Sequence, residues 1–289
     1  MRIAIVWPLC KDEVHIQGNI HRQMWSIPYY VGKGLQTLGY NPILYVSYAD
    51  QDADRVQKNL GGIDHIHIPS QLTITVQLQY HEDINKRTQH ISYVPHTLRY
   101  EDLGNEIENY DIIVLWPLFY YDIDPQLFKQ LAHKRLVLGN FGMFTYAVDG
   151  IMIKQYPERA RALLPYIDTL FLDEEELLFI TGEKTIDIAI KYISQYVNIL
   201  VVTRGYRGSI IYKQGNRYNI PAFPPKQIVD PTGSGDTYLA AFLSKEQETD
   251  DYAIIGRFAA MAATCKIEHL WPLIATKNQI EEKIGSYNL

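Results

Sequence analysis

The chain has 289 residues, 47% of them hydrophobic and 21% charged, so it is long enough to bury a substantial core. Its formal net charge of −6, from 27 basic and 33 acidic residues, excludes a broad basic surface for nucleic acid. The two cysteines, Cys10 and Cys265, are too few for a disulfide scaffold and favour a reducing compartment. Because the apolar run 1–6 is too short for a signal sequence or a membrane span, we expect a cytoplasmic protein without a membrane partner.

The first part of the chain alternates short apolar runs with amphipathic segments. We predict strands at 2–6, 42–46 and 63–68, and helices at 28–38 and 52–60. Residues 8–23 are polar, and we expect them to be irregular. The order strand, helix, strand, helix indicates a mostly parallel sheet with helices on both faces.

A different pattern follows near residues 70–95. Apolar and polar residues alternate from 72 to 80, a polar turn follows, and 87–94 runs back, which predicts a β-hairpin outside the parallel core. We interpret this hairpin as a lid whose polar face meets solvent or a partner subunit.

The second half returns to alternating strands and helices. We predict strands at 111–116, 136–138, 169–172 and 199–203, a small hairpin over 209–220, and helices at 125–132, 157–164, 174–180, 186–196 and 252–265. No linker or repeat is evident, so we expect a single α/β catalytic domain over residues 1–289.

The stretch 229–243 combines a glycine turn with an apolar helix. Gly233 and Gly235 bracket Ser234, so the backbone can bend and approach a ligand, and the following helix start offers unpaired N–H groups that suit an anion. Asp236 beside such amides makes chemical sense as a base that deprotonates an attacking hydroxyl. From Gly-Ser-Gly-Asp alone, a simple helix cap after a glycine turn fits equally well.

The whole stretch resembles the signature Asp-Thr-Thr-Gly-Ala-Gly-Asp-Thr/Ala-Phe of the ribokinase-like carbohydrate kinases. Asp230, Thr232, Gly233, Gly235, Asp236 and Thr237 match it, whereas Pro231, Ser234 and Tyr238 depart from it. The resemblance implies a three-layer fold with a small β lid, ATP and Mg²⁺ as cofactors, Asp236 as the catalytic base, and the backbone of Gly233, Ser234 and Gly235 as an anion hole. It leaves open a need for a monovalent cation and a homodimer formed through the lid.

Two further elements are similar to this family in the same order. Thr203-x-Gly205-x-x-Gly208 follows a predicted strand and resembles the family segment that borders the nucleotide. We therefore assign Thr203, Gly205, Gly208 and also Thr232 to the nucleotide site. The alternative is a simple turn, since glycines at strand ends are commonly only turns. Asp173 and Glu176 lie one helical turn apart and resemble an Asn-x-x-Glu motif, which implies Mg²⁺ binding. An acidic first helical turn, favoured by the helix dipole, is the alternative.

The acceptor elements match less well. Asp12 lies where the family binds its acceptor, while Trp25 and Ser26 replace a glycine pair and Tyr30 replaces an asparagine, so we assign Asp12, Trp25 and Tyr30 to the acceptor site. The short stretch between Asp12 and Trp25 suggests that the first lid strands are reduced or absent. Thr145 stands where the family often has an arginine, which disfavours a sugar phosphate. The acceptor is expected to be a sugar-like alcohol. A nucleoside, a hydroxymethyl-pyrimidine or pyridoxal-type alcohol, or a binding protein without turnover are the alternatives.

Overall fold

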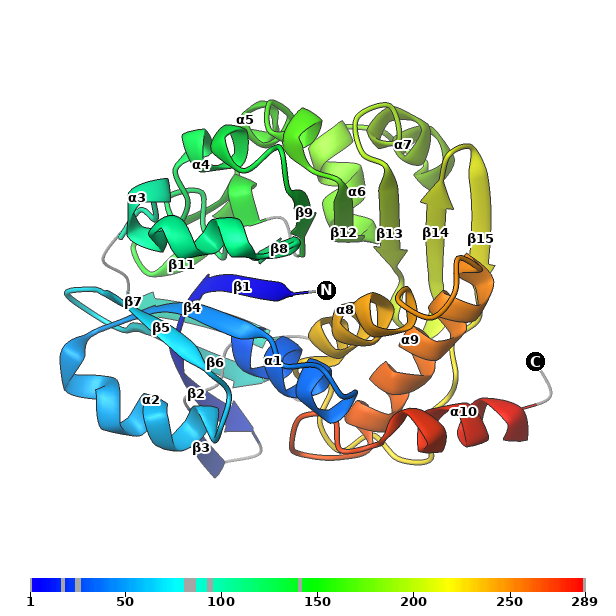
Figure 1. The fold of residues 1–289 in the computed structure, drawn as a ribbon, viewed down its shortest axis with the longest axis horizontal. Coiled ribbons are helices and arrows are strands. Elements are labelled where there is room, and N and C mark those ends of the chain that lie inside the picture. The colour runs from blue at the N-terminus through cyan, green and yellow to red at the C-terminus, as the bar shows by residue number, and fades with distance from the viewer. Residues whose placement is uncertain are drawn as a thin grey trace.

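The computed structural model describes residues 2–16, 19–23, 27–80, 87–92, 96–139 and 142–287, and their strands form one sheet of nine strands and one of six (Figure 1). In spatial order the large sheet contains β15 (Asn216–Ile220), β14 (Ser209–Lys213), β13 (Ile199–Thr203), β12 (Thr169–Asp173), β9 (Arg135–Leu138), β8 (Ile112–Leu115), β1 (Ile3–Pro8), β4 (Ile43–Tyr48) and β5 (His65–Pro69). The run from β13 to β5 is parallel throughout, and β14 runs antiparallel to both of its neighbours, β13 and β15. The predicted mostly parallel sheet is therefore confirmed.

Helices cover both faces of the large sheet (Figure 1). One layer contains α3 (Tyr100–Leu103), α4 (Pro125–Gln130), α5 (Pro157–Arg161), α6 (Glu174–Thr181) and α7 (Ile186–Ile193). The other contains α1 (Ile27–Thr37), α2 (Ala53–Leu60), α8 (Ser234–Lys245), α9 (Tyr252–Ile267) and α10 (Lys277–Ser286), of which α10 was not predicted. Short 3-10 turns lie at η1 (Asp50–Asp52), η2 (Asn105–Asn109), η3 (Gly142–Phe144), η4 (Leu164–Tyr166) and η5 (Gly205–Arg207).

The central strands are apolar throughout because each buries both of its faces. In β1, Ile3 and Ile5 belong to the core under α1, α8 and α9, whereas Ala4 and Val6 belong to the core on the opposite face. This alternation places one hydrophobic core on each side of the sheet and gives the predicted three layers.

The small sheet contains the predicted hairpin together with strands that the sequence did not reveal. Its spatial order is β10 (Thr145–Val148), β11 (Ile151–Lys154), β7 (Arg87–Ser92), β6 (Ile74–Tyr80), β2 (Cys10–Ile16) and β3 (Asn19–Gln23). The β6–β7 hairpin is confirmed. The prediction that 8–23 is irregular, with the first lid strands reduced or absent, is wrong: β2 and β3 pair with each other, and β2 also runs parallel to β6.

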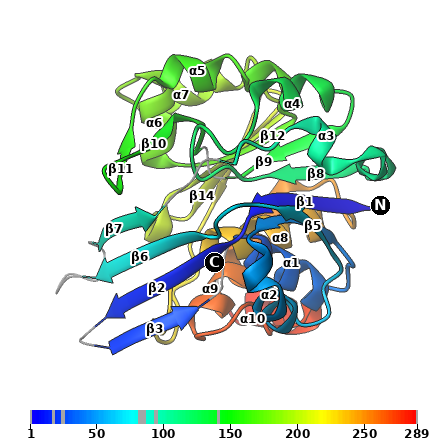
Figure 2. The same ribbon diagram turned by 90° about the vertical axis from the view of Figure 1, so that its left-hand side faces the viewer.

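The small sheet is attached where parallel strands of the large sheet end. β2 follows β1, β6 follows β5, and β10 follows β9 along the chain, and Figure 2 shows the small sheet projecting from that side. Open parallel sheets bind ligands outside the carboxyl ends of their strands. The small sheet therefore stands beside the edge at which a ligand site is expected.

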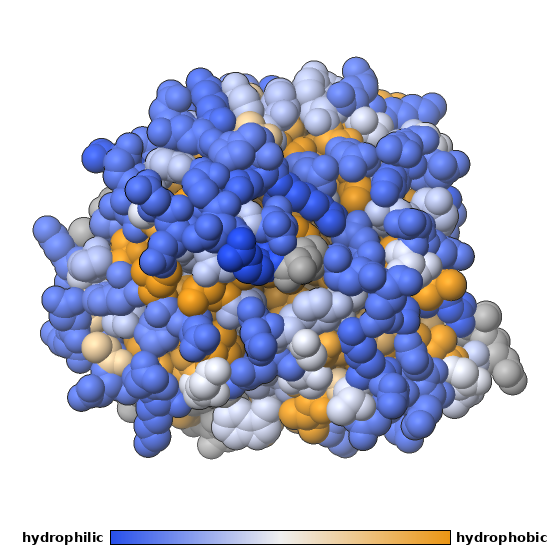
Figure 3. Space-filling model, in the orientation of Figure 1, coloured by the Kyte–Doolittle hydropathy of each residue, from blue (hydrophilic) through white to orange (hydrophobic). Residues whose placement is uncertain are grey.

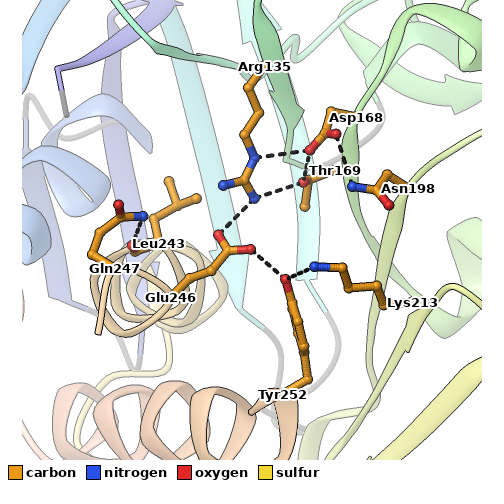
Figure 4. A network of polar contacts seen from close by, with 9 residues as sticks. All are labelled: Arg135, Asp168, Thr169, Asn198, Lys213, Leu243, Glu246, Gln247 and Tyr252. Carbon is orange, nitrogen blue, oxygen red and sulfur yellow. Dashed lines mark hydrogen bonds and ion pairs between the residues drawn. The ribbon is translucent and has the colours of Figure 1, made fainter. Parts of the chain in front are cut away.

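A polar network holds the C-terminal end of α8 at the amino edge of the large sheet, which is the edge opposite the small sheet (Figure 4). Arg135, which begins β9, donates from Nη2 to Glu246 at 2.7 Å and from Nε to Asp168 at 3.0 Å, and Glu246 also accepts from the Tyr252 hydroxyl at 2.8 Å. Glu246 directly follows the 12-residue helix α8. Since such a helix is about 18 Å long, its first turn lies toward the carboxyl edge.

The face of the molecule in Figure 3 is mainly hydrophilic, with apolar side chains in scattered groups. No helix in the described parts of the chain is long and apolar enough to cross a membrane.

Candidate active site

The glycine turn, residues 230–235, forms a tight bend at the start of α8. Gly233 has φ +76°, in the left-handed region, and Ser234 N–H donates to the Pro231 carbonyl at 3.2 Å. The amides of Gly233, Gly235 and Asp236 have no hydrogen-bond partner among the described residues. Unpaired amides at the positive end of a helix dipole suit an anion such as phosphate. Since Ser234 N–H is already engaged, Gly233 and Gly235 are the better donors of the predicted anion hole.

Asp236 lies in the first turn of α8 as a buried carboxylate without a hydrogen bond to the described residues. It is 9% exposed, and burial raises its pKa to about 7, a rise that the charge of Lys266 opposes. The helix-cap alternative does not describe this residue, because Gly233 occupies the N-cap and no side chain caps the helix. A carboxylate with a pKa near neutrality can take up a proton at physiological pH.

Asp173 and Glu176 form a reciprocal capping box at the start of α6. Glu176 N–H donates to Asp173 Oδ1 at 2.7 Å, and Asp173 N–H donates to Glu176 Oε2 at 3.0 Å. Glu176 is 8% exposed, and burial, followed by the charge of Asp173, raises its pKa to about 8, while Lys154 opposes the rise. The acidic helix start that we considered as the alternative is therefore present, and it is compatible with a metal role because each carboxylate keeps one oxygen outside the cap.

This donor set fits Mg²⁺. The described residues contain no cluster of three metal-ligating side chains. However, Mg²⁺ commonly uses only one or two carboxylates together with water and substrate phosphates. The elevated pKa of Glu176 reflects a buried carboxylate with too little positive charge nearby, a deficit that a divalent cation would remove.

The predicted nucleotide segment lies next to this pair. Thr203, the last residue of β13, is in register with Asp173, the last residue of β12. Arg207 in the following turn forms an ion pair with Glu174 at 2.7 Å, which joins the turn to the start of α6. Gly205 and Gly208 have φ +55° and +81°, and a Cβ at Gly208 would come 2.1 Å from the Ile220 carbonyl oxygen. The structure thus brings the predicted nucleotide and metal residues together at one edge.

Thr232 lies within the bend, and Tyr30 of α1 packs against it. Thr232 N–H donates to Asp230 Oδ1 at 2.9 Å. Tyr30 is 2% exposed, and its ring lies against Gly233. This placement favours a role for Tyr30 in shaping the bend over the predicted contact with an acceptor.

Of the other two predicted acceptor residues, the structure describes only the backbone of Asp12. The backbone of Asp12 lies in β2, opposite Gln23 of β3 and Val76 of β6, at the root of the small sheet. Its side chain and the whole of Trp25 lie outside the described residues.

Lys266 is a site residue that sequence reasoning missed. It is fully buried, and its ammonium hydrogen-bonds to Asp230, the first residue of the glycine signature. The sequence does contain a sign of this role. Lys266 directly follows the uncharged run 258–265 of an apolar helix, and a charged residue buried there needs a partner of opposite charge.

Together, the fold and the site define a three-layer α/β protein with an amide bend for an anion and a buried carboxylate beside it. The model of the pfkB family of carbohydrate kinases matches residues 62–272. The chain therefore belongs to the pfkB family of carbohydrate kinases, which confirms the family prediction.

Individual proteins extend this comparison. A nucleoside kinase of Methanocaldococcus jannaschii is 30% identical over 106 residues, which cover 37% of this chain and 34% of the relative, so the chain matches about one third of that protein's length. A pyrophosphate-dependent kinase of the ribokinase family, solved with a pyrophosphate analogue and myo-inositol, superposes with a TM-score of 0.84 at 19% identity, over 97% of this chain and 99% of that one. Arabidopsis thaliana ribokinase, solved with ribose and ATP, gives a TM-score of 0.74 at 17% identity, with 98% of each chain covered. These structures confirm the predicted fold.

Proposed function

We propose that the chain is an ATP-dependent kinase that transfers the γ-phosphoryl group to a hydroxyl of a small sugar-like molecule. The observation that carries this proposal is Asp236, a nearly buried carboxylate with a pKa of about 7 in the helix turn whose amides face no partner among the described residues. A carboxylate placed only to cap a helix would be hydrogen-bonded and acidic. Family membership supports the same chemistry.

The proposed reaction assigns each group one task. Asp236 accepts the proton of the acceptor hydroxyl, the hydroxyl oxygen forms a bond to the γ-phosphorus, and the bond from that phosphorus to the β,γ-bridging oxygen breaks, so that ADP leaves with the electron pair. The amides of Gly233 and Gly235 stabilise the charge on the moving phosphoryl group. A donor of this kind typically contributes about 10²- to 10³-fold to kcat.

Glu176 and Asp173 are the residues that would hold Mg²⁺, directly or through water. When bound, the ion neutralises charge on the donor phosphates. Thr203, Gly205, Gly208 and Thr232 would border the nucleotide, because Thr203 adjoins Asp173 and Thr232 directly precedes Gly233.

Inorganic pyrophosphate is a second candidate for the phosphoryl donor. The pyrophosphate-dependent kinase has a higher TM-score than the ATP-bound ribokinase, 0.84 against 0.74, so inorganic pyrophosphate in place of ATP deserves a direct comparison. The same two structures, with the nucleoside kinase, make myo-inositol, ribose and nucleosides the first acceptors to test. A hydroxymethyl-pyrimidine or pyridoxal-type alcohol completes the panel.

The small sheet is proposed as a lid, because three of its strands continue directly from carboxyl ends of the large sheet. Two copies pairing through this sheet would give the homodimer considered above. Amide exchange in 74–80 that is unchanged by ligand and by protein concentration would argue against both ideas.

The deciding experiment incubates the protein and Mg²⁺ with each donor and acceptor and detects the phosphorylated product by mass spectrometry and ³¹P NMR. We expect product with ATP and one acceptor class. Product with pyrophosphate alone would replace the donor assignment and keep the transfer chemistry. If an acceptor raises the melting temperature and yet no combination gives product, the chain is a binding protein and the proposal fails.

A further inference from the structure

The ammonium of Lys266 has a complete set of oxygen partners inside the protein. Lys266 is 0% exposed, and its Nζ donates to the Asp230 carbonyl at 2.9 Å, to Asp230 Oδ2 at 3.0 Å and to the His269 carbonyl at 3.2 Å. A lysine ammonium has three donors and no acceptor, so these three contacts use all of its hydrogens. The group is therefore fixed in position.

Lys266 binds Asp230, the residue at which the bend begins. Asp230 uses its second carboxylate oxygen to accept from Thr232 N–H at 2.9 Å. The amides of Val229 and Asp230 donate to the Ile267 carbonyl at 2.9 and 3.1 Å, next to Lys266 in sequence. The end of α9 thus anchors the start of the bend through backbone and side chain together.

The same ammonium also lies over the Tyr30 ring that packs against Gly233. Its Nζ is 5.5 Å from the centre of the Tyr30 ring, and that ring lies against Gly233. Its charge also acts on Asp236, where it opposes the rise in pKa that burial causes. A positive charge in this position favours both an ionised base and an approaching phosphate.

Two carbonyl oxygens and one carboxylate oxygen also form a ligand set that suits a hard cation such as K⁺. An ammonium held by all three oxygens and a free cation cannot share the same point. The oxygens that such an ion would need are already used by a side chain of the protein.

We propose that Lys266 is a positioning residue whose ammonium serves as a built-in cation of the transfer site: it orients the bend through Asp230 and takes the place of a free monovalent cation. The kinetic part of this inference rests on the proposed kinase function, whereas its cation part does not. The wild-type protein should accordingly need no K⁺.

The test compares wild type, Lys266→Ala and Lys266→Met in KCl, NaCl and choline chloride at equal ionic strength, by thermal unfolding and by steady-state kinetics. Wild type should show the same melting temperature and the same kcat, within about twofold, in all three salts. Lys266→Ala leaves the three oxygens facing an empty space, so K⁺ should raise its melting temperature above the value in choline and restore part of its activity. Lys266→Met fills that space without charge, so it should lose about 10- to 100-fold in kcat and respond to no salt.

A matched control is Lys283→Met, which removes the half-buried lysine partner of Glu268 close to the same helix end and should leave kcat and its salt response unchanged. Salt-specific rescue is the readout that a merely structural lysine would not produce. The inference is overturned if wild type requires K⁺, if K⁺ selectively raises the melting temperature of wild type, or if Lys266→Met keeps full kcat.

If both lysine variants fail to fold, the wild-type comparison across salts still decides the cation part. If wild type transfers phosphate to no acceptor, the kinase proposal fails. The melting temperatures of Lys266→Ala in KCl and choline would still report whether the oxygens accept K⁺.

Discussion

The ring of Tyr30 lies directly against the backbone of Gly233, so close that a Cβ at residue 233 would come 2.3 Å from Cδ1 of Tyr30. Gly233 also has φ +76°, which side chains with a Cβ rarely adopt. Two independent constraints therefore require glycine at the bend. Tyr30 reaches this position because α1 packs closely on α8, where a Cβ at Gly34 would come 2.9 Å from the Cβ of Ala240.

Gly233→Ala should therefore damage both stability and turnover. The left-handed backbone alone costs about 1–2 kcal/mol for a residue with a Cβ, and displacement of the Tyr30 ring adds to that cost. We expect a loss of about 2 kcal/mol or more in the free energy of unfolding, together with a decrease of about 10²-fold in kcat because the amides move. Urea unfolding and steady-state kinetics measure the two effects.

Gly39→Ala is the matched control for this variant. Gly39 has φ +88°, but a Cβ there would meet nothing within 4 Å. It should lose only the backbone cost and keep its kcat. Equal losses in both variants would mean that the Tyr30 contact does not constrain the bend.

Asp236→Asn should retain the fold and lose catalysis. The amide has the size of the carboxylate but cannot accept the acceptor proton, and a general base contributes about 10²- to 10⁴-fold. We expect kcat to fall by that factor with circular dichroism unchanged. In wild type, kcat/KM should rise with pH through about 7 as Asp236 ionises, and this limb should be absent from the variant. Turnover equal to that of wild type would remove Asp236 from the mechanism.

Asp236 should also impose a pH dependence on stability. Its pKa rises from 3.8 to about 7 on folding, so between these values the folded state binds more protons than the unfolded state, and the free energy of unfolding falls as pH increases. Replacing the carboxylate by a neutral amide removes this penalty. Asp236→Asn should be more stable than wild type at pH 8, by on the order of 1–4 kcal/mol, and similar to wild type near pH 4. Denaturant titrations at the two pH values measure the difference, and equal stability at pH 8 would contradict the assigned burial of the charge.

The sequence predicts the large sheet and the bend well, because both depend on local patterns. Short β-branched runs such as 199–203 are typical of buried strands, and the spacing of Gly233, Gly235 and Asp236 depends on a few neighbouring residues. The strand β2 was not predictable in this way. Its residues 10–16 are largely polar, and they become a strand because they pair with β6, more than 60 residues away in the sequence.

Lys266 and Tyr30 show the same limit at the site. The partner of Lys266 is 36 residues earlier, so only the folded chain places the end of α9 beneath Asp230. Tyr30 was assigned to the acceptor from its place in a motif, whereas the packing of α1 on α8 sets it against Gly233. In both cases the role of a residue depends on how a helix packs against a segment that is distant in the sequence, and no local pattern records that.

Glu176→Gln tests the proposed metal role without breaking the helix cap. Glutamine keeps an oxygen that can accept from Asp173 N–H but cannot ionise, so the substitution removes the negative charge that Glu176 would present to Mg²⁺. We expect the Mg²⁺ concentration for half-maximal activity to rise about 10-fold. The neighbouring Glu175→Gln changes an exposed carboxylate and should leave that concentration unchanged. An unaltered Mg²⁺ response in Glu176→Gln would assign Glu176 to the cap alone.

Arg135→Met should lower stability while leaving the chemistry intact. Arg135 pairs with Glu246, whose side chain is only 8% exposed, at the amino edge of the sheet and at the opposite end of α8 from Asp236 (Figure 4). Loss of the guanidinium leaves a buried charge without its partner, which costs about 3–5 kcal/mol. The control Arg217→Met breaks the exposed pair with Asp187 and should cost less than about 1 kcal/mol. Urea unfolding measures both losses, while kcat below the melting range should match wild type in each variant. A fall in kcat of Arg135→Met without a loss of stability would show that this network adjusts the bend instead of anchoring the helix.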